Sequence, residues 1–114
     1  MISRRYRPWL TVVGAALLWG GAISVPSLAQ TPDPNRIVIQ EFMFTPNPLT
    51  VKAGATVTWV NMDDEPHTVV SNTAMYRSGA LDTNESFSFK FVQPGTYHFT
   101  CSVHPRMVGV IVVQ

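Results

Sequence analysis

The single cysteine of the chain, Cys101, is followed three residues later by His104 and three residues after that by Met107. A thiolate, an imidazole and a thioether on one short segment form a set of soft ligands that suits copper. A second imidazole would complete the trigonal site of two histidines and one cysteine, with a weak axial methionine, that serves copper electron transfer. Two further histidines, His67 and His98, are available to supply it.

His98 is the weaker of these two candidates. Tyr97, Phe99 and Cys101 alternate along one predicted strand. Because successive side chains of a strand point to opposite faces, His98 points away from the face that carries Cys101. The sequence therefore predicts an exposed strand residue at His98.

His67 is the remaining candidate. It follows Pro66 at the start of another predicted strand, at the same kind of boundary between strand and loop as Cys101. A lone histidine after a polar loop is usually a surface residue, so the argument for His67 rests on its place and on elimination. The resulting prediction is one copper ion per chain, held by His67, Cys101, His104 and Met107.

The same spacing of three residues would also place Cys101, His104 and Met107 on one face of a helix, as ordinary packing residues. Pro105 would interrupt such a helix, and the β-branched residues on both sides favour strands. A tight reversal between two strands instead turns all three side chains toward one point. Pro105 stiffens that reversal and lowers the entropy lost on fixing the ligands.

The elements that must position these residues are short strands. A length of 114 residues allows one domain, and the apolar pattern after the N-terminal region has a period of two. This predicts an all-β Greek-key sandwich or barrel of about seven to eight strands over residues 37–114. The expected strands cover residues 37–44, 49–51, 56–60, 68–70, 87–91, 96–101 and 108–113, the last of them apolar on both faces and therefore central.

Residues 1–29 are predicted to be a secretory signal. Three arginines precede an apolar run over residues 9–25, and small residues stand before an expected cut after Ala29. The alternative is an uncleaved membrane anchor, but the run is short for a span of about 20 residues and is broken by glycines and a proline. We expect a periplasmic protein with no stable membrane insertion after cleavage, in which residues 30–36 form a flexible lead-in.

Charge and cysteine content narrow the possible partners. Without the three arginines of the signal, five basic residues oppose seven acidic ones, a balance of −2. A mildly acidic domain lacks the positive charge that nucleic-acid binding requires, so nucleic acid is not expected as a partner. An unpaired thiol is a hazard in an exported protein unless a metal ion occupies it, which agrees with a copper site.

The segment Cys101-Ser102-Val103-His104-Pro105-Arg106-Met107 resembles the short ligand loop of the amicyanin type within the plastocyanin-like cupredoxins. Pro66-His67, Pro94-Gly95-Thr96-Tyr97 and Val57-Thr58-Trp59-Val60-Asn61 resemble the same family, so the likeness covers nearly all of residues 30–114. The resemblance implies a type 1 blue copper protein and not an enzyme. It also implies a short thiolate bond from Cys101, a long axial contact from Met107, and ring nitrogens of His67 and His104 as the remaining ligands.

The resemblance further implies that the protein shuttles single electrons between redox proteins, such as a c-type cytochrome or a dehydrogenase or oxidase, as a monomer. The electron is expected to leave through the ring edge of His104, among Val103, Pro105 and either Pro46 or Pro48. The alternative is a periplasmic copper store or chaperone, which would hand over metal with the same four ligands.

Two positions depart from the family pattern. Many relatives have asparagine directly after the first histidine, where its side chain ties the two ligand loops together; here a hydroxyl of Thr68 or a backbone group must remake that tie. Arg106 replaces a bulky aromatic residue, which argues against an amine dehydrogenase as partner. The acidic run Asp63-Asp64-Glu65 is either a docking patch for a basic partner or a solvated loop.

Overall fold

The structure is a computed structural model that describes residues 13–26 and 31–114. The chain divides into two units, Met1–Gln30 and Thr31–Gln114. Residues 13–26 are exposed and form neither helix nor strand. The predicted cut after Ala29 and the arginines of the predicted signal lie outside the described residues. Within the part of the chain that is described, no helix has the length and apolar character needed to cross a membrane.

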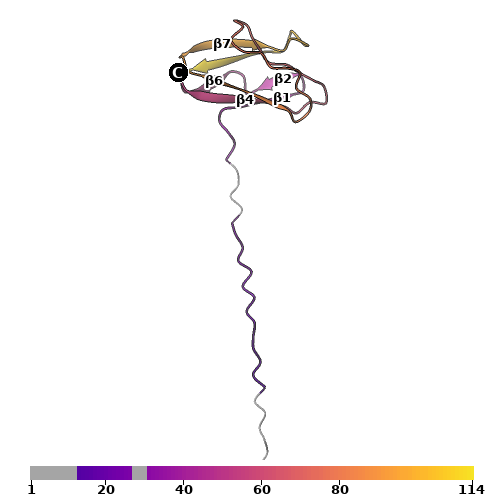
Figure 1. The fold of residues 1–114 in the computed structure, drawn as a ribbon, viewed down its shortest axis with the longest axis vertical. Coiled ribbons are helices and arrows are strands. Elements are labelled where there is room, and N and C mark those ends of the chain that lie inside the picture. The colour runs from indigo at the N-terminus through magenta and orange to yellow at the C-terminus, as the bar shows by residue number, and fades with distance from the viewer. Residues whose placement is uncertain (1–12, 27–30) are drawn as a thin grey trace, which may run out of the picture. The chain divides into compact units, whose positions relative to one another are not determined.

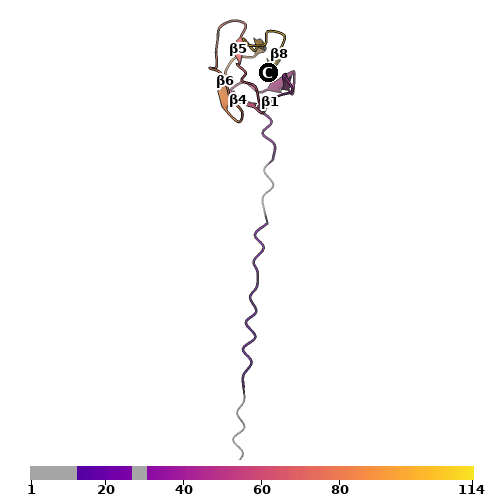
Figure 2. The ribbon, with the colours of Figure 1, turned by 90° about the vertical axis from the view of Figure 1, so that its right-hand side faces the viewer.

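Eight strands in two sheets form the unit Thr31–Gln114, and the described residues contain no helix, so the predicted all-β sandwich is confirmed (Figure 1). One sheet has the strand order β2-β1-β4-β6 and the other β3-β8-β7-β5. Seen from the side in Figure 2, the strands surround a common interior. The strands are β1 (Arg36–Gln40), β2 (Met43–Thr45), β3 (Leu49–Val51), β4 (Ala55–Asn61), β5 (Val70–Ser71), β6 (Ser86–Phe91), β7 (Gly95–Thr100) and β8 (Val108–Val113).

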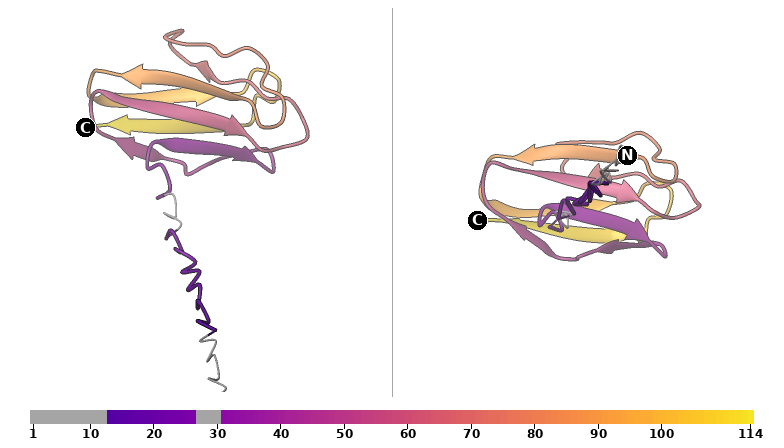
Figure 3. Two further views of the ribbon diagram at one scale, coloured as in Figure 1. Left: turned by 60° about the horizontal axis from the view of Figure 1, so that its bottom comes forward. Right: turned by 90° about the horizontal axis from the view of Figure 1, so that it is seen from below.

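Strand pairing brings the end of β7 and the start of β8 together. These two strands pair antiparallel from Gly95 opposite Val113 to Thr100 opposite Val108. The seven residues 101–107 therefore leave and re-enter the sheet at the same point. Elsewhere β1 runs parallel to β4 and β3 parallel to β8, which reflects a chain that crosses repeatedly between the two sheets (Figure 3).

Aromatic side chains fill the interior beneath this loop. Trp59 of β4 is fully buried and meets Phe99 of β7 edge to face, with ring centroids 5.4 Å apart. Phe44 of β2 packs against the same Phe99 at 4.7 Å. Edge-to-face pairs add about 0.5–1.5 kcal/mol beyond the burial of their area. The core thus holds both sheets, and with them both loops of the site, in fixed positions.

Two strand predictions differ from the structure, and a third is confirmed. The continuous strand predicted over residues 37–44 is wrong: β1 and β2 are joined by a turn at Glu41 and Phe42, which both have positive φ angles. The strand predicted over residues 68–70 is also displaced, because β5 covers only Val70–Ser71. The predicted central place of residues 108–113 is confirmed, since β8 lies between β3 and β7.

Candidate metal centre

The donors come from two loops at one end of the sandwich. Cys101, His104 and Met107 lie in the loop between β7 and β8, and His67 lies in the connection between β4 and β5. Two backbone bonds close the first loop: the N–H of Cys101 donates to the carbonyl of Met107 at 3.1 Å, and the N–H of Met107 donates to that of His104 at 2.9 Å. These bonds fold the loop back on itself and turn its side chains inward.

Nitrogen and sulfur donors converge on one point. The Sγ of Cys101 lies 3.8 Å from Nδ1 of His67 and 3.9 Å from Nδ1 of His104. Suitable ligand atoms of the three side chains all lie within 4.8 Å of one another. Nitrogen and thiolate ligands stand about 2.0–2.3 Å from a bound metal ion, so donors at these separations enclose the space of one ion.

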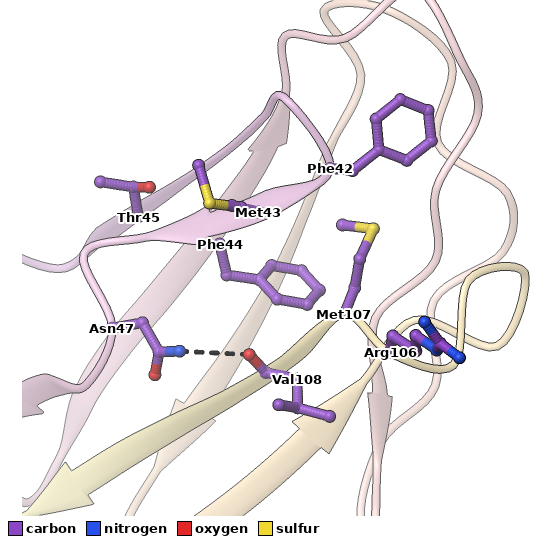
Figure 4. A pocket seen from close by; sticks show the side chains of 8 residues that line it. All are labelled: Phe42, Met43, Phe44, Thr45, Asn47, Arg106, Met107 and Val108. Carbon is purple, nitrogen blue, oxygen red and sulfur yellow. Dashed lines mark hydrogen bonds between the residues drawn. The ribbon is translucent and has the colours of Figure 1, made fainter.

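Met107 lies at the same end of the molecule. Its side chain is 6% exposed and, together with His104 and Phe42, lines a surface hollow. Figure 4 shows the Met107 side chain extending toward Phe42, while Arg106 turns away from it. Asn47 fixes the start of β8 beside Met107, because its amide donates to the carbonyl of Val108 at 3.1 Å. The four residues predicted from the sequence are therefore brought together, whereas His98 lies exposed on β7, as predicted.

The connection that carries His67 is anchored by a buried asparagine. Asn61, at the end of β4, is 0% exposed and donates its amide to the carbonyls of Glu65 and Leu81, each at 2.8 Å. The backbone of His67 pairs with that of Leu81 in both directions, at 3.1 and 2.7 Å. A fully satisfied buried polar network of this kind fixes one backbone conformation. The His67 ring is therefore positioned by a loop and not by a strand.

The imidazole of His67 is oriented by Asp63. The Nε2 atom of His67, which is 0% exposed, lies 2.8 Å from Oδ2 of Asp63. A carboxylate accepts hydrogen bonds, so this contact assigns the ring proton to Nε2 and leaves the lone pair of Nδ1 facing Cys101. Burial raises the pKa of Asp63, but backbone N–H groups of Phe42 and Glu41 and the His67 ring together lower that pKa below 3.8.

The thiol of Cys101 is buried and accepts a hydrogen bond. Its side chain is 0% exposed, and the backbone N–H of Thr68 points at Sγ from 3.4 Å. Hydrogen bonds to a sulfur ligand tune the metal that it holds, so this N–H is placed to influence a bound ion. The side-chain oxygen of Thr68 also bonds the hydroxyl of Ser102 at 2.7 Å. The loop that carries His67 and the loop that carries Cys101 are thus joined through the Thr68 hydroxyl. A hydroxyl was one of the two predicted alternatives, the other being a backbone group.

Phe42 covers the site, and this was missed in the sequence. Its ring stands edge-on to His67, with centroids 5.2 Å apart, and to His104, with centroids 4.9 Å apart. The hollow beside His104 is lined by Phe42, Val103 and Pro105 together with residues 106 and 107. The prediction of Val103 and Pro105 there is confirmed, but Phe42 takes the place expected for Pro46 or Pro48. No local signal marks Phe42, because a turn and not a strand places it.

The three acidic residues before His67 differ in their exposure and in their contacts. Asp64 and Glu65 are exposed, while Asp63 is held by hydrogen bonds to the turn at residues 41 and 42 and to His67. Asp63 therefore has a structural role, and the two predicted alternatives, a docking patch or a solvated loop, apply only to Asp64 and Glu65. The available signal was an aspartate that follows a buried strand and precedes a candidate ligand by four residues.

Comparison with known proteins agrees with this geometry. Residues 12–113 match the model of the cupredoxin-like domain family. Amicyanin-alpha of Methylorubrum extorquens is 34% identical over 68% of this chain and 70% of its own length. Plastocyanin of Scenedesmus fuscus is 40% identical over 63% of this chain and 87% of its own length. The solved structure of a purple cupredoxin from Nitrosopumilus maritimus has a TM-score of 0.66 at 30% identity, covering 69% of this chain and 98% of its own.

The donor set itself fits copper. A buried thiolate, two imidazole nitrogens and a thioether are the ligands of a type 1 site, and an N–H group aimed at the sulfur accompanies them here. The chain belongs to the family of cupredoxin-like domains, with copper as its cofactor, and it is a blue copper electron-transfer protein rather than an enzyme.

Proposed function

We propose that His67 and His104 through Nδ1, Cys101 through Sγ and Met107 through its thioether hold one copper ion that carries single electrons between redox proteins in the periplasm. When bound, copper supplies a one-electron exchange between its two oxidation states. The observation that carries the proposal is an asymmetry of burial: His67 and Cys101 are 0% exposed and Met107 is 6% exposed, while His104 alone is partly exposed. Electrons can pass through such a ring edge, but solvent and substrates are kept from the remaining donors.

The protein keeps the donors in place by connections that do not depend on the metal. The β7–β8 ladder fixes both ends of the loop that carries three donors, and Thr68 fastens that loop to the one carrying His67. Donors that do not rearrange let an electron enter or leave with little change in structure, which favours fast transfer. The same enclosure disfavours a copper chaperone, because a chaperone must open its ligands to a recipient.

The apolar surface around His104 is the proposed place of contact with redox partners. Val103 is 52% exposed and Phe42 is 46% exposed, and both lie beside the ring. Arg106 adds a positive charge at one margin, while Asp64 and Glu65 add negative charge on the neighbouring loop. We propose a transient encounter with a c-type cytochrome, dehydrogenase or oxidase, and a monomeric carrier, since such contacts are small and polar at their rims.

We further propose that residues 1–29 direct export and are removed, so that residues 30–36 lead into a cupredoxin domain over residues 37–114. Strand β1 begins at Arg36, one residue before the proposed start of that domain. The unpaired cysteine supports export with a bound metal, because a free thiol is otherwise at risk in an oxidising compartment. Cell fractionation of the full-length chain and sequencing of the N-terminus of the exported form test this, with Gln30 as the expected first residue.

The decisive experiment on the function is spectroscopic. The exported protein is loaded with one equivalent of Cu(II), and its visible and electron paramagnetic spectra are recorded before reduction, after reduction and after reoxidation. An intense thiolate-to-copper band that bleaches and returns with the metal retained supports an electron carrier. Release of the metal on reduction would favour a copper chaperone, and a colourless loaded sample would overturn the copper site.

A further inference from the structure

We propose that Asp63 is a positioning residue whose single carboxylate fixes both the buried ligand His67 and the turn that places Phe42 over the two histidine rings. The proposal rests on the proposed copper function for its effect on the metal, but the positioning itself concerns the protein alone. Through Asp63, the turn that carries the Phe42 ring is hydrogen-bonded to the proposed ligand His67.

The carboxylate of Asp63 contacts three groups: two backbone N–H groups and one imidazole ring. Its Oδ1 accepts the backbone N–H of Glu41 at 2.6 Å, and its Oδ2 accepts that of Phe42 at 3.0 Å. The same Oδ2 lies 2.8 Å from Nε2 of His67. The Asp63 side chain is 11% exposed, so these partners largely replace water. The arrangement joins the β1–β2 turn to a ligand 26 positions further along the chain.

The turn needs such a partner because of its backbone conformation. Glu41 and Phe42 have φ angles of 53° and 58°, and Gln40 pairs with Met43, so the two residues form a two-residue hairpin loop. Positive φ at both central residues is the conformation for which Asn-Gly is preferred. A side chain with a Cβ costs roughly 1–2 kcal/mol in this region. Two consecutive N–H groups held in this way form a concave anion-binding site, which the Asp63 carboxylate occupies.

The turn determines where Phe42 lies. The ring stands almost perpendicular to both imidazoles, at 88° to His67 and 89° to His104. Phe42 is nearly half exposed, so burial in the core is not what holds it there. The backbone bonds to Asp63 hold it instead. Loosening the turn would therefore uncover the histidine edges without disturbing the hydrophobic core.

The carboxylate also acts on the metal ligand. An anionic acceptor on Nε2 makes the imidazole a stronger donor at Nδ1 and adds negative charge close to the site. Both effects favour the more highly charged oxidation state of a bound copper ion, and so lower its reduction potential.

The test compares Asp63→Asn with Asp64→Asn. Both variants remove one negative charge, but Asp64 is exposed and makes none of these contacts, so it is the matched control. In the metal-free protein, Asp63→Asn is expected to move the backbone amide resonances of Glu41 and Phe42 and the His67 ring resonances, whereas Asp64→Asn leaves them in place. In the copper protein, Asp63→Asn is expected to lower Cu(II) affinity about 10–100-fold, as loss of a partner of a metal ligand typically does. Cu(I) affinity should fall less, which is a positive shift in potential.

A third variant separates the two roles. Asn at position 41 tolerates the positive φ of the turn without an anion and leaves Phe42 in place, so adding Glu41→Asn to Asp63→Asn should restore part of the lost stability. The potential should remain shifted, because the partner of His67 still lacks its negative charge. Equal potentials and equal spectra for Asp63→Asn and Asp64→Asn would overturn the proposal. If the wild type forms no blue centre while the metal-free resonances respond as expected, the copper function fails and the positioning role stands.

Discussion

The hydroxyl of Thr68 lies 2.7 Å from that of Ser102 and also accepts the backbone N–H of Ser102, at 2.8 Å. Each residue directly follows a proposed ligand, His67 and Cys101 respectively. If the Ser102 hydroxyl donates in this pair, the Thr68 hydroxyl is free to point at Sγ of Cys101, 3.7 Å away. The Thr68 side chain thus joins the loops that carry His67 and Cys101, and it also lies beside Sγ of Cys101.

Thr68→Val should loosen this joint while preserving the shape of the side chain. The substitution removes the acceptor of the Ser102 N–H in a part-buried contact, which costs about 1–2 kcal/mol in the free energy of unfolding. Denaturant unfolding of the metal-free protein measures this loss. The thiolate band and the reduction potential should also change, because the surroundings of the Cys101 sulfur change.

Thr58→Val is the matched control for that variant. Thr58 and Ser88 form a similar hydroxyl pair, 2.8 Å apart, on the outer surface of strands β4 and β6. Water can replace a lost partner there, so the expected cost is below about 1 kcal/mol. Identical spectra and potentials for wild type, Thr68→Val and Thr58→Val would show that the hydroxyl has no influence on the copper centre.

Met107→Leu should retain copper and raise its reduction potential. A thioether donates weakly along the axis and stabilises the oxidised metal, whereas leucine fills a similar volume with no donor. The change conserves volume at a side chain that is 6% exposed, so unfolding should cost less than about 1.5 kcal/mol. Voltammetry of the two copper-loaded proteins checks the shift, and an unchanged potential would contradict the axial role of Met107.

Cys101→Ala should abolish the intense blue colour, because that band arises from the bond between the thiolate and copper. The two imidazoles remain, so weaker metal binding with an ordinary copper spectrum is expected. Titration with Cu(II) followed by visible and electron paramagnetic spectroscopy measures both. Retention of the blue band in this variant would rule out Cys101 as a ligand.

Gly109→Ala should destabilise the fold through the ring of Phe99. A Cβ built at Gly109 overlaps that ring, and Phe99 is 1% exposed and packed against Trp59 and Phe44. Because the ring has nowhere to move, overpacking is expected to cost about 1–3 kcal/mol. Gly79→Ala is the control, since a Cβ at Gly79 meets no atom within 4 Å. Thermal unfolding with equal midpoints for the two variants would contradict this packing argument.

The sequence was sufficient to predict those residues of the site that lie close together in the chain. Cys101, His104 and Met107 occupy one loop, so their spacing alone predicts that they meet, and a chain with three histidines leaves few choices for the remaining nitrogen. The central place of β8 between β3 and β7 was likewise predicted, although only one of its two apolar faces is fully buried. These inferences depend on near neighbours and on composition.

The cover of the site could not be predicted from local sequence. Glu41 and Phe42 are not residues that mark a two-residue hairpin turn, and the strand pattern continues through them. Their conformation is stabilised by Asp63, which is 22 and 21 residues away in the sequence. Only the fold brings that carboxylate to the turn, and only the turn brings Phe42 to the histidines. For this reason Phe42, and not Pro46 or Pro48, lines the hollow beside His104 together with the predicted Val103 and Pro105.

Tyr76→Phe should leave stability at neutral pH unchanged or raise it by up to about 1 kcal/mol. Tyr76 is 6% exposed, and its hydroxyl has no hydrogen-bond partner among the described protein groups, so it loses water without compensation. Phenylalanine keeps the ring packing against Phe89, whose centroid lies 4.6 Å away. Tyr97→Phe is the matched control, because the Tyr97 hydroxyl donates to the carbonyl of Gln93 at 2.7 Å and its loss should cost about 1 kcal/mol.

The same variant should change stability at alkaline pH. Burial raises the pKa of Tyr76 above its ordinary value of 10.0, so the folded protein keeps the hydroxyl protonated where the unfolded chain would lose its proton. The stability due to this difference is fully present below pH 10 and is lost as the pH rises above it. Tyr76→Phe should therefore lose less stability between pH 9 and pH 11 than the wild type does, as measured by denaturant unfolding. Parallel losses in both proteins would mean that the Tyr76 hydroxyl ionises as readily in the folded state as in the unfolded chain.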